Sequence, residues 1–417
     1  MLGSAPGSPL KLRFFLGLLV WNPLFLTAQS TRLDLALADT NVRKAIALLD
    51  AHTPQTAEYL ASIAAIVSPS GNELERANAV AKRMREIGLR NVSVDSAPNV
   101  IGVIPGKSEK ALVFVSTLDD LANVADNQRA ATHPPHIVGD RVVGPGTNTS
   151  STTAGMLAAA EAIVQSGIQP EEGLVFAAVA QEETGLIGMR KLYADYKGRA
   201  SAFVDILGDG RRITYGALGI HWWKVVATGP GGHSLNGGVP NVNQAIGRSV
   251  DRILSLPYPE QNKESHTVIN VAMIQSGVVF NHKPETGWFS LDIRSMDNGT
   301  IAKIEEDVRG ILAQVAKETT IDLRMEVRQS TPGGQIPGAR ESELVRNCEA
   351  ISKYLGLNPV LGNAGSSNMN IPIGGGTLAI GFGGERGGQR GFPDEWADIP
   401  AMMRSAKQVL LLGVTMH

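Results

Sequence analysis

The chain has 417 residues, of which 43% are hydrophobic and 19% are charged, and this balance is typical of a compact protein with two or three domains. Its 38 basic and 40 acidic side chains leave a net charge of -2, so no long-range field favours nucleic acid or an anionic membrane surface as a partner. The single cysteine, Cys348, excludes disulfides within the chain and zinc sites built from cysteines. Any bound metal ion would have to be held by carboxylates and imidazoles.

The first 30 residues have the order of an export signal. Two basic residues precede an apolar run over 14–26, and the small residues Ala28 and Ser30 follow where a signal peptidase would cleave. The run is shorter than the roughly 20 residues needed to span a bilayer, so an uncleaved anchor is the weaker interpretation. We expect residues 1–30 to be a signal peptide and the mature protein to be periplasmic or extracellular, without membrane contact.

The next part of the chain alternates predicted helices and strands. Ser70-x-x-Glu73 has the form of a capping box, and apolar residues then recur at helical spacing until Gly88. Three short apolar runs predict strands, with a helix over 156–163 between the first two. Strands that alternate with helices indicate an α/β domain with a mostly parallel sheet and helices on both faces. The predicted strands cover 111–116, 173–180 and 202–204.

Acidic residues follow each of these strands. Asp119 and Asp120 come after the first, Glu182 and Glu183 after the second, and Asp205 after the third. In open α/β sheets the chemistry lies at the carboxyl ends of the strands. We therefore expect these acids to gather at one edge of the sheet.

The pattern of apolar residues changes near residue 220. Apolar stretches at 222–227, 268–274 and 288–293 predict antiparallel strands, and helices are predicted near 243–254 and 300–317. The pair Trp222-Trp223 is expected in the core of this unit. After 337 the first pattern returns, with a helix over 341–355 and a strand over 377–382. The sequence thus predicts a discontinuous outer domain over 31–219 and 331–417, and an inserted α+β domain over 220–330.

Several motifs in this order resemble the dinuclear zinc hydrolases related to aminoacylase, carboxypeptidase G, acetylornithine deacetylase and succinyl-diaminopimelate desuccinylase. The resemblance runs from about residue 60 to 412. Each motif alone is weak, and their common order makes the signal strong. They are Ser68-Pro-Ser-Gly-Asn-Glu73, Asn99, Gly144-Pro-Gly146, Glu182-Glu183-x-Gly-x-x-Gly188, Gly229-Pro-Gly-Gly-His233-Ser, Asn281, Leu291-Asp-Ile-Arg294, Asn370-Ile-Pro372 and Asp394-Glu395-Trp396.

The resemblance implies a chemistry and an assembly. The insert would be a lid that also forms a homodimer interface, and the substrate would be a peptide or an N-acyl amino acid. Two zinc ions would share a bridging carboxylate, with Glu182 as general base on a metal-bound water. Asp119 would orient a metal ligand, and His233 of the partner subunit would support the oxyanion. Asn281 and Arg294 match lid residues that face the substrate.

The resemblance also implies five metal ligands, and three of them are missing here. Thr117 stands where the first histidine should be, Thr149 where the bridging aspartate should be, and Gly391 where the second histidine should be. No carboxylate occurs between Asp140 and Glu161 to replace the bridge. Only Glu183 and Asp205 remain, one for each zinc, whereas catalytic zinc normally has three protein ligands. We therefore expect no zinc, or weak zinc, in this chain.

The remaining acids would repel one another without metal, unless they take up protons or meet a replacement cation. Arg390 is the candidate cation, because it lies beside the vacated histidine position and a guanidinium can bridge carboxylates. It is also the candidate for substrate binding. The alternative is that Arg390 points into solvent.

Two functions from different classes remain open. The first is a metal-free family member that binds a peptide or acyl amino acid with little or no hydrolysis, that is, a pseudoenzyme. The second is an active metallopeptidase or amidohydrolase with ligands recruited from His133, His136 or Asp120. The His133-Pro-Pro-His136 segment otherwise reads as a stiff, solvated loop. A purely structural dimer with a filled site is a third possibility.

Overall fold

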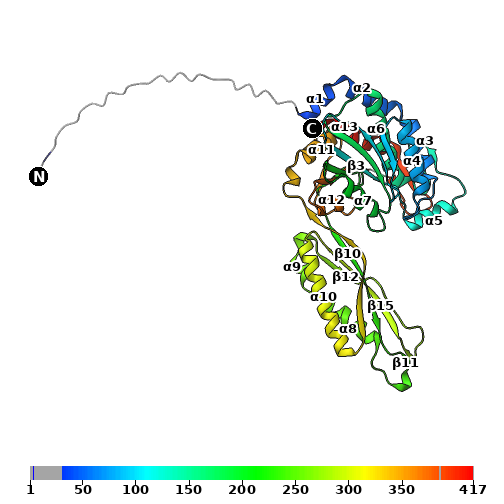
Figure 1. Cartoon of the computed structure of the whole chain (residues 1–417), viewed down its shortest axis with the longest axis vertical. Coiled ribbons are helices and arrows are strands. Elements are labelled where there is room, and N and C mark those ends of the chain that lie inside the picture. The colour runs from blue at the N-terminus through cyan, green and yellow to red at the C-terminus, as the bar shows by residue number, and fades with distance from the viewer. Residues whose placement is uncertain (1–2, 4–30, 385–386, 417) are drawn as a thin grey trace.

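The computed structural model describes residue 3, residues 31–384 and residues 387–416. Apart from residue 3, the predicted signal peptide lies outside the described residues. The rest of the chain forms two units that follow one another along the long axis of the molecule, an outer domain and a lid domain (Figure 1). Among the described residues, no helix combines the length and the apolar character needed to cross a membrane.

The outer domain is built on an eight-stranded sheet with the order β1-β2-β6-β3-β7-β19-β8-β18. The four central strands, β6, β3, β7 and β19, run parallel, whereas β1 and β2 pair antiparallel at one edge. The predicted α/β sheet is thus confirmed. The strands are β1 (Arg90–Val94), β2 (Val100–Ile104), β3 (Ala111–Thr117), β6 (Gly173–Val179), β7 (Ala200–Asp205), β8 (Arg212–Thr214), β18 (Val360–Gly362) and β19 (Ala379–Gly381).

Helices bury both faces of this sheet, as the continuous apolar strands require. In β3, Leu112 and Phe114 join one core cluster, while Val113 and Val115 join the other on the opposite face. The first face is covered by α2 (Thr40–Ala51), α3 (Thr53–Ala64), α4 (Leu74–Glu86), α6 (Thr147–Ser166), α11 (Glu343–Tyr354) and α13 (Ile399–Thr415), and the second by α7 (Ile187–Tyr196) and α12 (Asn370–Gly374). Around them lie α1 (Arg32–Ala38), α5 (Ala122–Ala130), the 3-10 turn η3 (Ala339–Glu341), and a small sheet of β4 (His136–Val138), β5 (Arg141–Val143), β20 (Gly387–Gly388) and β21 (Trp396–Asp398).

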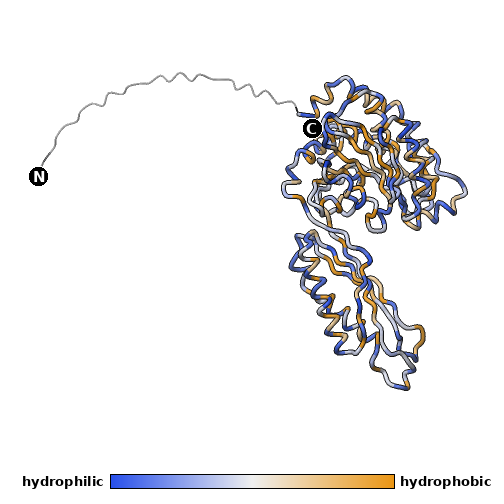
Figure 2. Tube along the Cα trace, in the orientation of Figure 1, coloured by the Kyte–Doolittle hydropathy of each residue, from blue (hydrophilic) through white to orange (hydrophobic). Residues whose placement is uncertain are grey.

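The lid domain is an antiparallel sheet with the order β12-β15-β10-β16, to which β13 adds beside β15. Two helices cover one face only, and Figure 2 shows the apolar positions of the strands. Its elements are β10 (Gly219–Thr228), β11 (Gly232–His233), η1 (Ser234–Asn236), α8 (Val242–Leu254), α9 (Tyr258–Gln261), η2 (Lys263–Ser265), β12 (Val268–Asn270), β13 (Ile274–Ser276), β14 (His282–Lys283), β15 (Thr286–Ser295), α10 (Asn298–Thr319) and β16 (Asp322–Thr331).

The alternation in β10 decides which tryptophan enters the lid core. Trp223, Val225 and Ala227 are buried against α8 and α10, so Trp222 and Lys224 point to the other face of the sheet. Trp222 is 40% exposed. The prediction that both tryptophans are core residues is therefore wrong for Trp222, because neighbouring residues of a strand face opposite ways.

Two chain segments connect the domains, and they are fastened to each other. β9 (Gly216–Ala217) on the way out pairs antiparallel with β17 (Gly334–Gln335) on the way back. The buried Asn370 side chain donates from Nδ2 to the carbonyls of Leu218 (2.8 Å) and Pro332 (2.9 Å). The side-chain amide of Asn370 is therefore hydrogen-bonded to both segments that connect the domains.

Two local predictions are corrected. Ser70 and Glu73 form no capping box, because helix α4 starts at Leu74 and both side chains bind elsewhere. The helix predicted over 156–163 is longer than expected, because helix α6 begins at Thr147. Ser151 Oγ and Thr152 Oγ1 donate within the helix, to the carbonyls of Asn148 at 2.7 Å and Thr149 at 2.9 Å. Thr153 Oγ1 instead lies 2.9 Å from Ser116 Oγ of β3, and Ser150 Oγ is buried without a hydrogen-bond partner among the described residues.

Candidate functional site

The carboxyl ends of β3, β6 and β7 meet at one edge of the large sheet. The last residue of β3, Thr117, lies opposite Val179 of β6, and Val115 lies opposite Asp205, the last residue of β7. The acidic residues that follow these strands are therefore neighbours, as their positions in the sequence predict. We call Asp119, Glu182, Glu183 and Asp205 the acid site.

Asp119 fixes the turn that carries the two glutamates. It is fully buried, and its Oδ1 and Oδ2 accept hydrogen bonds from the backbone N–H groups of Glu182 (2.9 Å) and Glu183 (3.1 Å). Ser70 Oγ donates to Oδ2 at 2.6 Å. The residue before the turn, Gln181, has a φ of 54°, a strained conformation for a residue with a side chain. Asp119 thus shapes the backbone of the turn through these hydrogen bonds.

Asn368 links the two other strand ends. Its Nδ2 lies 3.3 Å from Thr117 Oγ1 and 3.4 Å from Asp205 Oδ1, and the residue is fully buried. The amide occupies the space between the position of the missing first histidine and the surviving aspartate. The sequence motif at this position contains Asn370 but not Asn368.

Arg390 contacts the acid site. Its Nη2 lies 2.5 Å from Glu183 Oε1, and the two side chains are 37% and 24% exposed. The guanidinium therefore contacts one carboxylate of the acid site while its side chain stays partly exposed, and no bridge between two carboxylates is seen among the described residues. A carboxylate that binds a guanidinium is already neutralised by it.

Glu395 connects the two other positions where ligands are missing. Its Oε1 accepts from the N–H of Asn148, in the first turn of α6 beside Thr149, at 2.8 Å, and its Oε2 accepts from the N–H of Gly391 at 3.1 Å. Gly391 has a φ of +87°, and a Cβ there would lie 2.7 Å from Asn123 Nδ2. A histidine at position 391 would therefore strain the present loop.

Three more acidic residues lie around the acid site, and their burial disfavours the charged form of each carboxyl group. Burial raises the pKa of Glu73, of Asp120 and of Glu395 above their ordinary values. Asp120 is held by Arg76, whose Nη2 lies 2.6 Å from Asp120 Oδ2 with both side chains almost fully buried. Sequence reasoning missed Arg76, although it shares an i, i+4 row with Val80 and Met84 on the buried side of α4. The signal in the sequence was a charged residue, Arg76, in line with apolar residues on the buried side of the helix, which indicates a buried ion pair.

The described residues do not bring together the five ligands that the resemblance implies for a dinuclear zinc centre. Among the described residues no group of three histidine, cysteine, aspartate or glutamate side chains is arranged to hold a metal ion. Glu183 binds Arg390, and Thr117 offers a hydroxyl next to an amide where an imidazole would be needed. Three protein ligands are normal for catalytic zinc, and this donor set does not supply them.

The alternative ligands lie elsewhere. His133 and His136 are exposed and line a surface cavity of about 370 Å³ with Pro393, and His136 Nδ1 contacts the carbonyl of Pro134 at 3.2 Å. Asp120, the third candidate, is engaged by Arg76. His133 and His136 thus share one cavity, but Asp120 does not line it.

The lid candidates form two separate contacts. His233 Nε2 lies 3.0 Å from Asn281 Nδ2 in the β11–β14 ribbon, at the end of the lid far from the outer domain (Figure 1). Arg294 binds Asp292 through Nε, 3.1 Å from each carboxylate oxygen. The structure therefore does not bring His233 to the acid site of its own chain.

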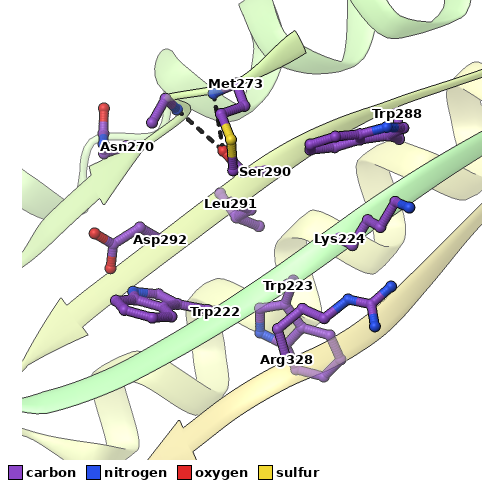
Figure 3. Close-up of a pocket in the computed structure, with 11 residues that line it drawn as sticks. Trp222, Trp223, Lys224, Asn270, Met273, Trp288, Ser290, Leu291, Asp292 and Arg328 are labelled. Atoms are coloured by element: carbon purple, nitrogen blue, oxygen red, sulfur yellow. Dashed lines mark hydrogen bonds between the residues drawn. The ribbon is translucent and has the colours of Figure 1, made fainter. Parts of the chain in front are cut away.

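A cavity of about 510 Å³ lies on the uncovered face of the lid sheet. Trp222 from β10 and Trp288 from β15 lie along it, and Lys224 lies beside Trp288 in Figure 3. The Lys224 ammonium is 4.8 Å from the centre of the Trp288 ring, a cation–π distance. This cavity belongs to the lid alone.

Two family models match the chain. Residues 99–220 match "Peptidase family M28", which covers the part of the outer domain that holds the acid site. Residues 215–320 match "Peptidase dimerisation domain", which covers most of the lid. A search of curated proteins finds no match.

Solved structures share the whole fold. A tripeptidase from Staphylococcus aureus subsp. aureus Mu50 superposes with a TM-score of 0.74 at 19% identity, over 86% of this chain and 97% of that one. The aminopeptidase PepT from Bacillus cereus ATCC 10987 gives 0.72 at 17% identity, over 87% and 98%. An M20 family metallo-carboxypeptidase from Sulfolobus solfataricus gives 0.72 at 15% identity, over 86% and 99%. At such identities the likeness establishes the two-domain fold.

Proposed function

We propose that this chain, an M20-like member of the peptidase and aminohydrolase families, is a metal-free descendant of the metallopeptidases. It would bind a peptide or an N-acyl amino acid with little or no hydrolysis. The protein works as a homodimer assembled through the lid and is exported after its signal peptide is removed. The acid site is kept as a binding surface, and the zinc chemistry is lost.

One observation carries this proposal, the contact between Arg390 and Glu183. It places a permanent cation on one of the two carboxylates that survive from the implied ligand set. A divalent cation would have to displace the guanidinium and then find further ligands, while Thr117, Thr149 and Gly391 offer none of the imidazoles and carboxylates that zinc requires.

The groups left at the site suit recognition of a polar ligand. Arg390 can share its five N–H donors between Glu183 and a ligand carboxylate or carbonyl. His233, Asn281 and Arg294 are the lid residues that would contact the same ligand. For His233 this requires the lid of the partner, because the tip of each lid lies far from the acid site of its own chain.

The test is metal analysis of the purified protein after dialysis against zinc, with hydrolysis assays on dipeptides and N-acyl amino acids. We expect far less than one equivalent of zinc and no turnover above background. About two equivalents of tightly bound zinc with turnover would establish the active metallopeptidase instead.

A ligand-restoring variant provides the control. Thr149 and Thr153 share one face of α6, and Thr153 Oγ1 lies 2.9 Å from Ser116 Oγ next to the end of β3. The double variant Thr117→His/Thr149→Asp would therefore add an imidazole and a carboxylate beside Asp205. We expect this variant to bind about one zinc, since three ligands suffice for a catalytic-type site. If wild type and variant bind zinc equally, the missing ligands are not what limits binding.

A further inference from the structure

The face of the lid sheet opposite helices α8 and α10 carries the cavity of about 510 Å³, a size that suits a small molecule. Large apolar side chains are gathered there at the surface. Trp222 is 40% exposed and Met273 is 51% exposed, and Trp288 lines the same hollow. Apolar groups that gather at a hollow of the surface, in place of single scattered residues, indicate a binding site.

The two tryptophans lie toward opposite ends of this cavity (Figure 3). Trp222 of β10 faces Asp292 of β15, whereas Trp288 of β15 faces Val226, four residues further along β10. At about 3.3 Å per residue, this register separates the two tryptophans by about 13 Å along the strands. A ligand that contacts both indoles must therefore be elongated, with about two rings in a row.

The aromatic rings alone would suit a cationic ligand, but a cation of the protein already occupies one of them. The Lys224 ammonium lies 4.8 Å from the centre of the Trp288 ring. A second cation at this end of the cavity would be repelled by the ammonium. An anionic group would be attracted to it.

The other charges at the cavity are balanced in pairs. Glu326 faces Lys224 across the sheet, but its Oε2 lies 2.7 Å from Arg328 Nη2. Asp292 is bound by Arg294. Because each of these acids has an arginine, the charge of Lys224 is left in excess. Arg328 also lines the cavity and has further N–H donors for a ligand carboxylate.

The body of the ligand should be aromatic. None of the ring pairs among the described residues includes Trp222, so its face is open to a ring of the ligand. A ring gains stacking energy on an indole in addition to the area that it buries, whereas an alkyl chain gains from burial alone.

We propose that this cavity binds an elongated aromatic carboxylate. The carboxylate lies on Lys224 beside Trp288, and the rings extend along the sheet to Trp222. This site is on the lid and the acid site is on the outer domain, so the inference does not depend on the function proposed above.

Biphenyl-4-carboxylate is the probe, titrated by calorimetry into the chain without its predicted signal peptide. At the binding energy per atom of ordinary small ligands, we expect a Kd of about 0.1–1 mM. Two analogues have the same rings, the neutral 4-biphenylmethanol and the cationic 4-biphenylmethylamine. In ligand-observed NMR we expect both to bind about tenfold more weakly than the carboxylate. Dodecanoate, an aliphatic carboxylate, should also bind more weakly.

Two substitutions separate the contributions of charge and ring. Lys224→Met keeps an unbranched apolar stem, so it should weaken the carboxylate about tenfold and leave 4-biphenylmethanol unchanged. Trp222→Ala should weaken both compounds. Lys303→Met is the matched control, because the Lys303 ammonium lies 5.9 Å from the centre of the Tyr258 ring in the lid but does not line the cavity. Circular dichroism verifies that each variant is folded.

The contrary outcomes are distinct. Absence of detectable binding, equal binding of the carboxylate and the amine, or a Kd that neither Lys224→Met nor Trp222→Ala changes overturns the lid site. Tighter binding of dodecanoate than of the probe overturns its aromatic character. Loss of binding in Arg390→Ala, with Lys224→Met unchanged, would place the carboxylate at the acid site, which overturns the lid site and supports the function proposed above.

Discussion

The carboxyl group of Glu73 lies in an environment that disfavours its ionised form, because the residue is buried. Its Oε1 accepts from the N–H groups of Gly71 (2.7 Å) and Gln181 (3.0 Å), whereas Oε2 is buried without a hydrogen-bond partner among the described residues. Burial is the main cause that raises the pKa of Glu73 above 4.5. The folded state therefore binds this proton more tightly than the unfolded state does.

The sign of the pH effect follows. A raised folded-state pKa gives stability that is fully present below the unfolded pKa and is lost as the pH rises through the folded pKa. In Glu73→Gln the amide oxygen keeps the two N–H contacts and no charge is buried. We expect the melting temperature of Glu73→Gln to exceed that of wild type by more at pH 7 than at pH 4, measured by calorimetry. The exposed Glu75→Gln serves as control, and an equal difference at both pH values would contradict the argument.

The position of a single residue could be predicted from the sequence where it follows from charge balance alone. Arg390 was inferred from the unbalanced acids, and it contacts one of them, Glu183. Arg76 and Asn368 were not inferred, because each acts through one specific contact between distant segments. No composition or spacing rule states that an asparagine at 368 will meet a threonine at 117.

At the scale of elements, α6 shows how a poor helix sequence is held in place. Its first turns are rich in serine, threonine and asparagine, which favour other conformations, yet they are helical and buried. Asn148 fastens the helix start to the C-terminal segment, because its Nδ2 donates to the carbonyls of Gly388 (3.1 Å) and Trp396 (2.9 Å). Tertiary contacts thus override propensity.

Removal of this amide should have a measurable cost. We expect Asn148→Ala to lower the free energy of unfolding by about 1–3 kcal/mol in urea titrations, because buried carbonyls lose their donor. Asn123→Ala is the control. Its Nδ2 donates to the carbonyl of Gly391 at 3.1 Å, but Asn127 Nδ2 donates to the same oxygen at 2.9 Å, so the loss there is small. Equal effects of both variants would show that the contact of Asn148 is not special.

The elements that the sequence predicted are those with continuous or strictly alternating apolar residues, such as β3, β6 and β10. The helices over residues 32–64 and strand β16 were not predicted. In β16 the apolar residues Leu323, Met325 and Val327 alternate with charges, which is the period-two pattern of a strand, so the signal was present in the sequence and was missed.

At the scale of the whole molecule, the two domains have separate cores. The lid core is a cluster of its own that includes Phe289, Leu291 and Val308, and it is distinct from the two clusters of the outer domain. A unit with its own core can in principle fold alone.

We therefore expect a fragment of residues 219–331 to unfold cooperatively in thermal melts and to give dispersed amide signals in NMR spectra. Phe289→Ala in the same fragment removes a fully buried ring and should cost about 3–5 kcal/mol, which tests whether the core is the native one. A fragment without a cooperative transition would mean that the lid needs the outer domain to fold.

The turn that carries Asn368 and Asn370 has a mechanical consequence. Asn368 contacts the strand ends at Thr117 and Asp205. Two residues later, Asn370 donates hydrogen bonds to both segments that connect the domains, at Leu218 and Pro332. A ligand that pushes Asn368 aside would pull on the attachment of the whole lid through one short stretch of backbone. Binding of a ligand at the acid site would therefore be coupled to the attachment of the lid through residues 368–370.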